Sequence, residues 1–218
     1  MTIHHILKKN SVLNTFIKEI RDHIIQKDTM RFRRNIERIG EVAAYELSKT
    51  LRFKSVDVTT PLGIASTSLL EEQPVLGTIL RAGLPLHQGM LNYFDKADNA
   101  FISAYRKHHP DGSFEISLEY LSCPDLNNRI LILCDPMLAT GASLVETIQA
   151  IQKTYTPAQI HIVVTIASHK GIEHVEKELG ADTLIWCAAI DPILNDKSYI
   201  VPGLGDAGDL AFGTKMQS

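Results

Sequence analysis

The fold of this chain is decided by residues 129–154, which read RILILCDPMLATGASLVETIQAIQKT. Residues 129–134 make a short run rich in Ile and Leu, which predicts a strand covered on both faces. Pro136 cannot donate to a strand ladder, so the strand is expected to end there. After Gly141, apolar residues recur at the spacing of an amphipathic helix. They are Leu144, Val145, Ile148, Ile151 and Tyr155. We therefore expect a buried strand, a tight turn and a helix packed on the same sheet.

The turn in this unit, residues 135–143, has the features of a phosphate site. Gly141 has no side chain, so an anion can approach the backbone closely. The first amides of the next helix lack intrahelical partners and carry the positive end of its dipole. Thr140 and Ser143 add hydroxyl donors, and Asp135 follows the carboxyl end of the strand. From geometry alone, a purely structural turn is an equally good interpretation, because many α/β proteins use a glycine-containing strand-to-helix turn for packing only. Neither a Walker nor a GxGxxG pattern is present, so a dinucleotide site is not indicated.

The complete turn, DPMLATGAS, resembles the phosphoribosyl-pyrophosphate loop of the uracil phosphoribosyltransferase family. Residues 79–86, ILRAGLPL, resemble the second substrate loop of that family. Residues 199–215, YIVPGLGDAGDLAFGTK, resemble its uracil-binding tail. The three motifs come in the family's order and span most of the chain, although residues up to about Ser55 match loosely.

The resemblance implies an α/β protein: a single phosphoribosyltransferase domain over residues 1–218, with a Rossmann-like parallel sheet. It also implies an N-terminal helical arm and a β-hairpin hood over the substrate. The implied reaction joins uracil to 5-phosphoribosyl 1-pyrophosphate and yields UMP and pyrophosphate, as in pyrimidine salvage. Magnesium is expected through the pyrophosphate, with no metal site formed by the protein alone. Family members often form dimers or larger assemblies, so a homo-oligomer is expected.

The resemblance also assigns roles to individual residues. Arg81 and Arg106 would neutralise the pyrophosphate, Asp135 would hold the ribose hydroxyls, and residues 140–143 would hold the 5′-phosphate. The residues implied for phosphoribosyl-pyrophosphate binding are Arg81, Arg106, Asp135, Pro136, Met137, Leu138, Ala139, Thr140, Gly141, Ala142, Ser143 and Asp206. Those implied for uracil are Ile200, Gly205, Asp206 and Ala207, mainly through their backbone groups. Arg81, Arg106, Asp135 and Asp206 would take part in catalysis, and no general base is assigned.

Three positions depart from common patterns. Pro136 stands where most nucleotide-type phosphoribosyltransferases have a second acid, as in the uracil branch. Ala142 stands where the family more often has a second glycine, and its methyl group fits only if its φ is negative. Residues 107–109, Lys-His-His, differ from the acidic or amide-rich residues usual there. The last departure concerns closure of the hood.

Along the rest of the chain, strands alternate with helices, which predicts a parallel sheet with helices on both faces. Expected strands are residues 55–60, 74–80, 99–105, 159–167 and 183–190. Expected helices are residues 12–23, 85–94 and 169–179, together with a further helix that begins after the first one and is capped by Thr29. Residues 101–121 read as two strands joined through a Pro-Asp-Gly turn. The glycine-rich residues 199–213 predict an ordered loop, because a frayed end would rarely contain so many apolar side chains.

The composition is that of a globular domain: 218 residues, 44% hydrophobic and 22% charged, with a net charge of −3. This charge argues against a broad nucleic-acid surface, and no apolar run approaches the roughly 18 residues of a membrane span. The N-terminal residues lack a signal-peptide core, which favours the cytoplasm. Cys123, Cys134 and Cys187 show no CxxC pattern, and the last two read as core thiols. The nine histidines are expected to be structural.

Two alternatives stay open. An RNA-binding pyrimidine regulator on the same fold would need a basic face and salt-sensitive RNA binding. An inactive, degenerate subunit would have lost the need for Arg81. A third feature, the arginines at 31, 33, 34 and 38, reads as a solvated or subunit-facing surface rather than as a site for an anionic effector.

Overall fold

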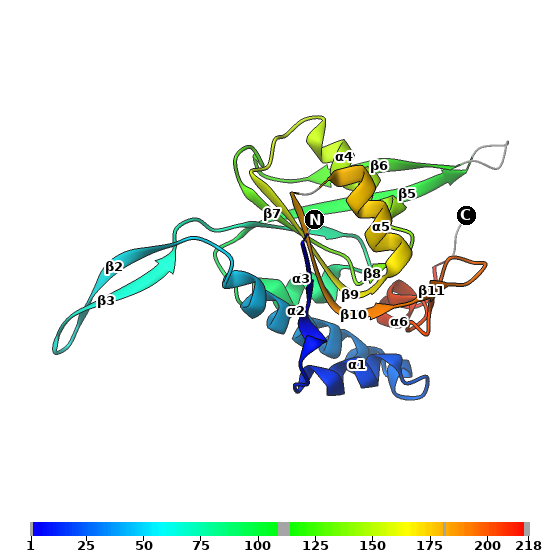
Figure 1. Cartoon of the computed structure of the whole chain (residues 1–218), viewed down its shortest axis with the longest axis horizontal. Coiled ribbons are helices and arrows are strands. Elements are labelled where there is room, and N and C mark those ends of the chain that lie inside the picture. Colours follow the sequence, from blue (N-terminus) through cyan, green and yellow to red (C-terminus); the bar gives the residue numbers. More distant parts are fainter. Residues whose placement is uncertain (1, 109–113, 181, 216–218) are drawn as a thin grey trace.

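The computed structural model describes residues 2–108, 114–180 and 182–215, with the backbone alone for 104–108 and 114–119. Its main sheet has eight strands in the order β1-β10-β9-β7-β4-β5-β6, and β8 also pairs with β9 (Figure 1). The strands are β1 (Thr2–His5), β4 (Val75–Ile79), β5 (Asp98–His108), β6 (Phe114–Ser122), β7 (Ile130–Cys134), β8 (Met137–Leu138), β9 (Gln159–Ser168) and β10 (Thr183–Asp191). Every pairing is parallel except that of β5 with β6. The predicted α/β parallel sheet is therefore confirmed.

Helices cover both faces of this sheet, and each layer has its own apolar core. On one face lie α1 (Leu13–Arg21), α2 (Thr29–Ser48) and α3 (Leu84–Leu91), with the short 3-10 helices Ile6–Lys8 and Ile25–Lys27 nearby. On the other lie α4 (Ala142–Gln152) and α5 (His169–Leu179). Successive residues of β7 point to opposite layers, as in a strand buried on both faces.

The N-terminal helices are part of the packed body and do not form a separate arm. Phe32, Ile36 and Leu47 of α2 are at most 1% exposed and belong to the core beneath the sheet. The predicted cap of α2 was wrong by one residue: the Asp28 side chain accepts from the Arg31 amide at 3.0 Å, and Thr29 is the first helical residue. Asp is a good cap for the same reason as Thr, because its side-chain oxygen satisfies a free amide.

The element that does project is a two-stranded hairpin, β2 (Phe53–Thr60) and β3 (Gly63–Leu70), which extends from the body in Figure 1. The sequence predicted one strand here and missed its partner, because the Ser- and Thr-rich segment of β3 carries little apolar alternation. β1 was also missed. It adds a parallel edge strand beside β10.

The hairpin expected over the substrate is present as β5 and β6, with an irregular register between Ser103 and Ala104. Its connection, residues 109–113, lies outside the described residues, and so does the predicted Pro-Asp-Gly turn. The side chains of Arg106, Lys107 and His108 also lie outside the described part of the chain. Their predicted roles in closure therefore stay predictions.

The C-terminal tail is ordered, as expected, but it is more than a loop. It contains β12 (Ile200–Val201), which pairs with the preceding strand β11 (Ile193–Leu194), and the short helix α6 (Ala207–Phe212). Ile200, Leu204 and Ala211 are at most 4% exposed and join the core that contains α1 and α2. This burial holds the glycine-rich segment in place.

Two further expectations concern the core and the membrane. Cys134 and Cys187 are fully buried, and burial raises the pKa of Cys187 to about 12 and raises that of Cys134 as well. No helix in the described ranges has the length and apolar character needed to cross a bilayer.

Candidate active site

The candidate site lies along one edge of the main sheet. Because its central strands are parallel, their carboxyl ends meet at the same edge, where α/β proteins usually bind ligands. Arg81 follows β4, Asp135 follows β7, and Asp191 ends β10. The motif residues are thus gathered by the topology of the sheet.

The first half of the predicted phosphate loop, residues 135–138, is held by β9. β8 pairs in parallel with β9, placing Met137 beside Ile166. The Pro136 carbonyl accepts from the amides of Thr165 and Ile166 at 3.0 and 3.1 Å. Pro136 and Leu138 are buried, so their side chains support the loop and do not face a ligand.

The second half of the loop is held by the start of α5. The Ser168 hydroxyl donates to the Ala139 carbonyl at 2.5 Å and accepts from the Gly171 amide at 2.9 Å. A Cβ on Gly171 would lie 2.5 Å from the Ala139 carbonyl oxygen, so only glycine allows this approach. Neither support was predicted from the sequence. A serine directly before a predicted helix is a capping signal that could have identified Ser168.

Residues 140–143 lead into α4, with Gly141 as the buried cap residue and Thr140, Ala142 and Ser143 partly exposed. Gly141 has φ +79°, a left-handed conformation that favours glycine. Ala142 is the first helical residue, so its φ is negative and its methyl group fits. The Thr140 hydroxyl accepts weakly from the Ala142 amide at 3.4 Å. Met137, Ala139, Thr140, Ala142 and Ser143 are all partly exposed, which leaves this half of the loop open to solvent.

Asp135 is the acidic group of the loop. It is half-buried, and loss of hydration raises the pKa of its carboxyl to about 7. The Met137 amide donates to it at 3.5 Å and opposes this rise only in part. A perturbed carboxyl at the ligand-binding edge of a parallel sheet is a typical feature of a functional site.

Arg81 connects the phosphate-loop edge to the C-terminal tail. Its guanidinium donates to the Asp209 carboxylate at 2.8 Å, to the Gly213 carbonyl at 2.6 Å and, more weakly, to the Phe212 carbonyl at 3.5 Å. On its other side, a Cβ on Gly83 would lie 2.6 Å from the Cys134 carbonyl oxygen, directly before Asp135. The loop after β4 therefore touches both regions. Asp209 was not among the predicted residues, because its partner is 128 positions away.

The four residues predicted for uracil lie along this tail. Ile200 and Ala207 are buried, whereas Gly205 and Asp206 are exposed. Asp206 caps α6, with its side chain accepting from the Asp209 amide at 2.9 Å. Gly205 has φ +96°. The exposed segment thus offers backbone groups at the edge that carries Arg81.

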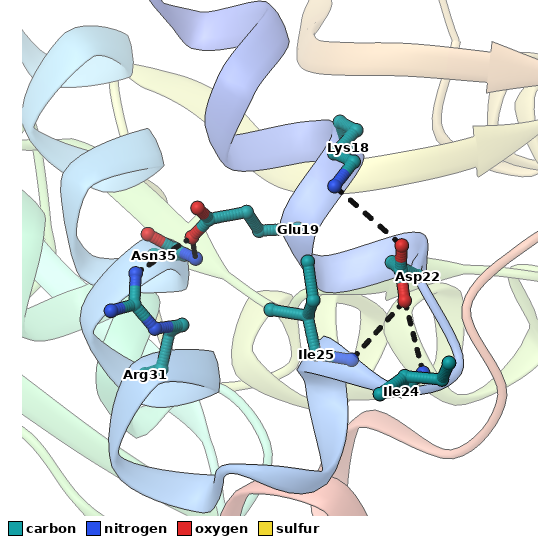
Figure 2. A network of polar contacts seen from close by, with 7 residues as sticks. All are labelled: Lys18, Glu19, Asp22, Ile24, Ile25, Arg31 and Asn35. Carbon is teal, nitrogen blue, oxygen red and sulfur yellow. Dashed lines mark hydrogen bonds and ion pairs between the residues drawn. The ribbon is translucent and has the colours of Figure 1, made fainter.

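The arginines of α2 are paired within the chain. Arg31 and Asn35 both donate to Glu19, at 3.3 and 2.7 Å, and Figure 2 shows them converging on it from α2.

The other three arginines of α2 also have partners. Arg34 pairs with Glu37 at 2.6 Å. Arg33 donates to the Ala211 carbonyl at 2.7 Å, and Arg38 lies over the ring of Phe16. These contacts favour structural roles over a site for an anionic effector.

Two surface hollows lie away from the phosphate loop. One is lined by Thr2, Ala158, Gln159, Asp182 and Leu184. The other, beside the tail, is lined by Arg33, Glu37, Leu84, Pro85, Gln88 and Phe212. Neither contains residues 135–143, which lie on an open edge. In the described part of the chain, no three His, Cys, Asp or Glu side chains are grouped to hold a metal ion.

Comparison with known proteins agrees with this geometry. The family model described as uracil phosphoribosyltransferase matches residues 7–214. A uracil phosphoribosyltransferase of Porphyromonas gingivalis is 50% identical, covering 99% of this chain and 100% of its own. One from Methanothermobacter thermautotrophicus is 39% identical, covering 85% of each chain. The solved structure of the AQ2163 protein from Aquifex aeolicus superimposes with a TM-score of 0.86 at 27% identity, covering 99% of this chain and 100% of that one. The fold, the order of the motifs and these matches show that the chain belongs to the uracil phosphoribosyltransferase family.

Proposed function

We propose that this protein transfers the phosphoribosyl group of 5-phosphoribosyl 1-pyrophosphate to uracil, giving UMP and pyrophosphate, as a pentosyltransferase of pyrimidine salvage. The observation that carries this proposal is the position of Arg81. Its guanidinium bonds the tail at Asp209 and Gly213, while its loop packs on the end of β7 beside Asp135. A phosphate cradle and a base-binding segment at one edge suit a substrate pair that must react with each other.

In this mechanism the protein mainly positions the substrates and stabilises charge. Departure of pyrophosphate leaves positive charge on the ribose and negative charge on the leaving group. Arg81 would exchange its tail contacts for the pyrophosphate, with Arg106 as the second cation. Asp135 would accept from the ribose hydroxyls and lie close to the positive sugar. The amides at the start of α4, with Thr140 and Ser143, would hold the 5′-phosphate.

Magnesium is proposed to enter with the pyrophosphate. Mg²⁺ usually binds through substrate phosphates together with one or two carboxylates, while it keeps several waters. Asp135, half-buried at the end of β7, would be one carboxylate of this edge available to it. When bound, the ion would neutralise charge on the leaving group.

Uracil would be recognised by the tail backbone. One edge of uracil alternates acceptors with a donor, and backbone groups at Ile200, Gly205 and Ala207 can match such a pattern. Cytosine would place an amino group where a donor expects an acceptor, which leaves buried groups unpaired at about 1–3 kcal/mol each. Asp206 would lie near the sugar or the base nitrogen.

The direct test incubates the purified protein with 5-phosphoribosyl 1-pyrophosphate, Mg²⁺ and uracil, and measures UMP. Cytosine, hypoxanthine and adenine serve as matched acceptors. Turnover of another base without turnover of uracil would reassign the substrate. Tight, salt-sensitive RNA binding without any turnover would support the regulator instead.

The projecting hairpin supports a homo-oligomer. Leu62 and Ile64 on it are 98% and 76% exposed, and Phe53, Val58 and Leu69 are exposed as well. Apolar side chains gathered on a protruding element usually contact another chain. Replacing Leu62 and Ile64 with Asp should reduce the mass measured by light scattering. An unchanged mass would exclude the hairpin as the contact. Cytoplasmic location stays a prediction from the sequence.

A further inference from the structure

A buried ion pair lies behind the predicted base-binding tail. Asp191, the last residue of β10, is 5% exposed. Arg21, the last residue of α1, donates to both of its carboxylate oxygens, each at 2.8 Å. This bidentate geometry is the strongest and most directional form of an arginine–carboxylate pair. It joins the helical layer to the ligand-binding edge of the sheet.

The same two side chains also bind the backbone of Gly203. The Arg21 guanidinium donates to the Gly203 carbonyl at 3.0 Å, and the Gly203 amide donates to Asp191 at 2.9 Å. Gly203 has φ +56°, and a Cβ there would collide with the Ile200 carbonyl. Both polar backbone groups of this residue are therefore fixed by one ion pair, between two positions predicted to meet uracil.

A neighbouring contact extends this support. With its amide turned so that the nitrogen donates, Gln26 reaches the carbonyls of Ile20 at 3.0 Å and Leu204 at 2.8 Å. Residues 203 and 204 are thus held by side chains from positions 21 and 26. A glycine-rich segment has many accessible conformations, so a recognition surface made of its backbone needs such external support to be preorganised.

We propose that Arg21 and Asp191 are positioning residues for base recognition: they hold the backbone from Gly203 onward in the conformation that accepts uracil. This inference rests on the proposed function. Neither side chain needs to touch the substrate. The pair acts through Gly203, so its loss should weaken uracil binding and leave the phosphate loop, anchored separately on β9 and α5, unchanged.

The test compares Arg21→Gln, Asp191→Asn and the double variant with the wild type. Each single variant should raise the KM for uracil about tenfold, equal to one lost contact of about 1.4 kcal/mol. The KM for 5-phosphoribosyl 1-pyrophosphate should stay within about twofold, since the two subsites are supported independently. The KM for uracil of the double variant should be no higher than that of either single variant, because the double variant leaves no buried charge unpaired.

Arg31→Gln is the matched control. Arg31 also pairs with a carboxylate in the N-terminal helices, Glu19, and the contacts drawn in Figure 2 all lie within residues 18–35. Both KM values should match the wild type. Where Arg21→Gln fails to fold, Arg21→Lys carries the test, because lysine keeps the charge but cannot bond two carboxylate oxygens and Gly203 together.

The outcomes separate two failures. A wild-type protein without uracil turnover overturns the proposed function and the inference with it. An active wild type, with Arg21 and Asp191 variants that melt earlier but keep a normal KM for uracil, overturns the positioning role alone. The ion pair would then serve only stability.

Discussion

The predicted phosphate loop and the predicted base-binding tail both contact the Arg81 loop at one edge of the sheet, but they are held in different ways. The loop is supported within its own strand–turn–helix unit and by its direct neighbours β9 and α5. The tail is held by three arginines from distant parts of the chain, Arg21, Arg33 and Arg81. A locally built cradle tolerates change elsewhere in the molecule, whereas the tail depends on side chains more than a hundred residues away. The predictions below test this difference.

The largest effect is expected at Arg81, the residue shared by both regions. Arg81→Ala should lower kcat/KM by about 100- to 1,000-fold, since it would remove the cation proposed for the leaving group and would release Asp209 and the end of the tail. Steady-state kinetics with both substrates varied would measure it. Arg129→Ala is the control, because Arg129, directly before β7, pairs with Asp98, the first residue of β5, at the amino ends of these strands. Unchanged ligand binding in Arg81→Ala would favour an inactive subunit.

A pair of glycine substitutions should separate the two regions. Gly141→Ala and Gly203→Ala both place a Cβ on a left-handed residue, at a strain of about 1–2 kcal/mol, and the Cβ at 203 would also collide with the Ile200 carbonyl. Gly141→Ala should raise the KM for 5-phosphoribosyl 1-pyrophosphate about tenfold or more, and Gly203→Ala that for uracil. Initial rates, measured with each substrate varied in turn, would show which KM each variant changes. If both variants affect the same substrate, the two supports are not independent.

A smaller effect is expected from pH. The pKa of Asp135 is raised to about 7 by loss of hydration, so the carboxylate dominates above pH 7 and the neutral acid below it. If the ionised form holds the ribose, kcat/KM should fall about tenfold per unit as the pH drops below 7. Asp135→Asn should be poorly active with a flat profile in this range. A wild-type profile that stays flat from pH 8 to 5.5 would remove Asp135 from this role.

The smallest effect on activity is expected at His161, away from both regions. Its ring accepts from Trp186 at 3.0 Å, and burial, with the nearby His4, lowers its pKa from 6.5 to about 4. The unfolded chain therefore takes up this proton first as the pH falls. The contribution of His161 to the free energy of unfolding is complete above about pH 6.5 and should decline by about 2 kcal/mol by pH 5, while Asp135, whose pKa is raised, contributes with the opposite sign. Denaturant unfolding at pH 7 and pH 5 would measure this, and His161→Gln should lose much of the difference.

Local patterns in the chain were enough to predict most elements. The run at β7, the helical spacing of α4 and the capping glycine after α5 each depend on residues within a few positions of one another. The elements that were missed lack such a pattern. β1 is recognised as a strand only by its pairing with β10, and β3 is a Ser- and Thr-rich strand whose partner is β2. The short helix α6 was hidden in a segment whose glycines favour a loop.

The sequence by itself determined the parallel α/β fold, the position of the phosphate turn and the family, because each is written in contiguous residues with strong local preferences. Only the tertiary structure decided that Arg81 lies against Asp209, that Ser168 holds the loop, and that Arg21 and Asp191 clamp Gly203. These contacts join residues from 12 to 182 positions apart, and those of Arg81 and Arg21 with the tail span more than a hundred. Local sequence preferences do not predict contacts between residues so far apart in the chain. The contacts form only when the sheet brings its strand ends to one edge.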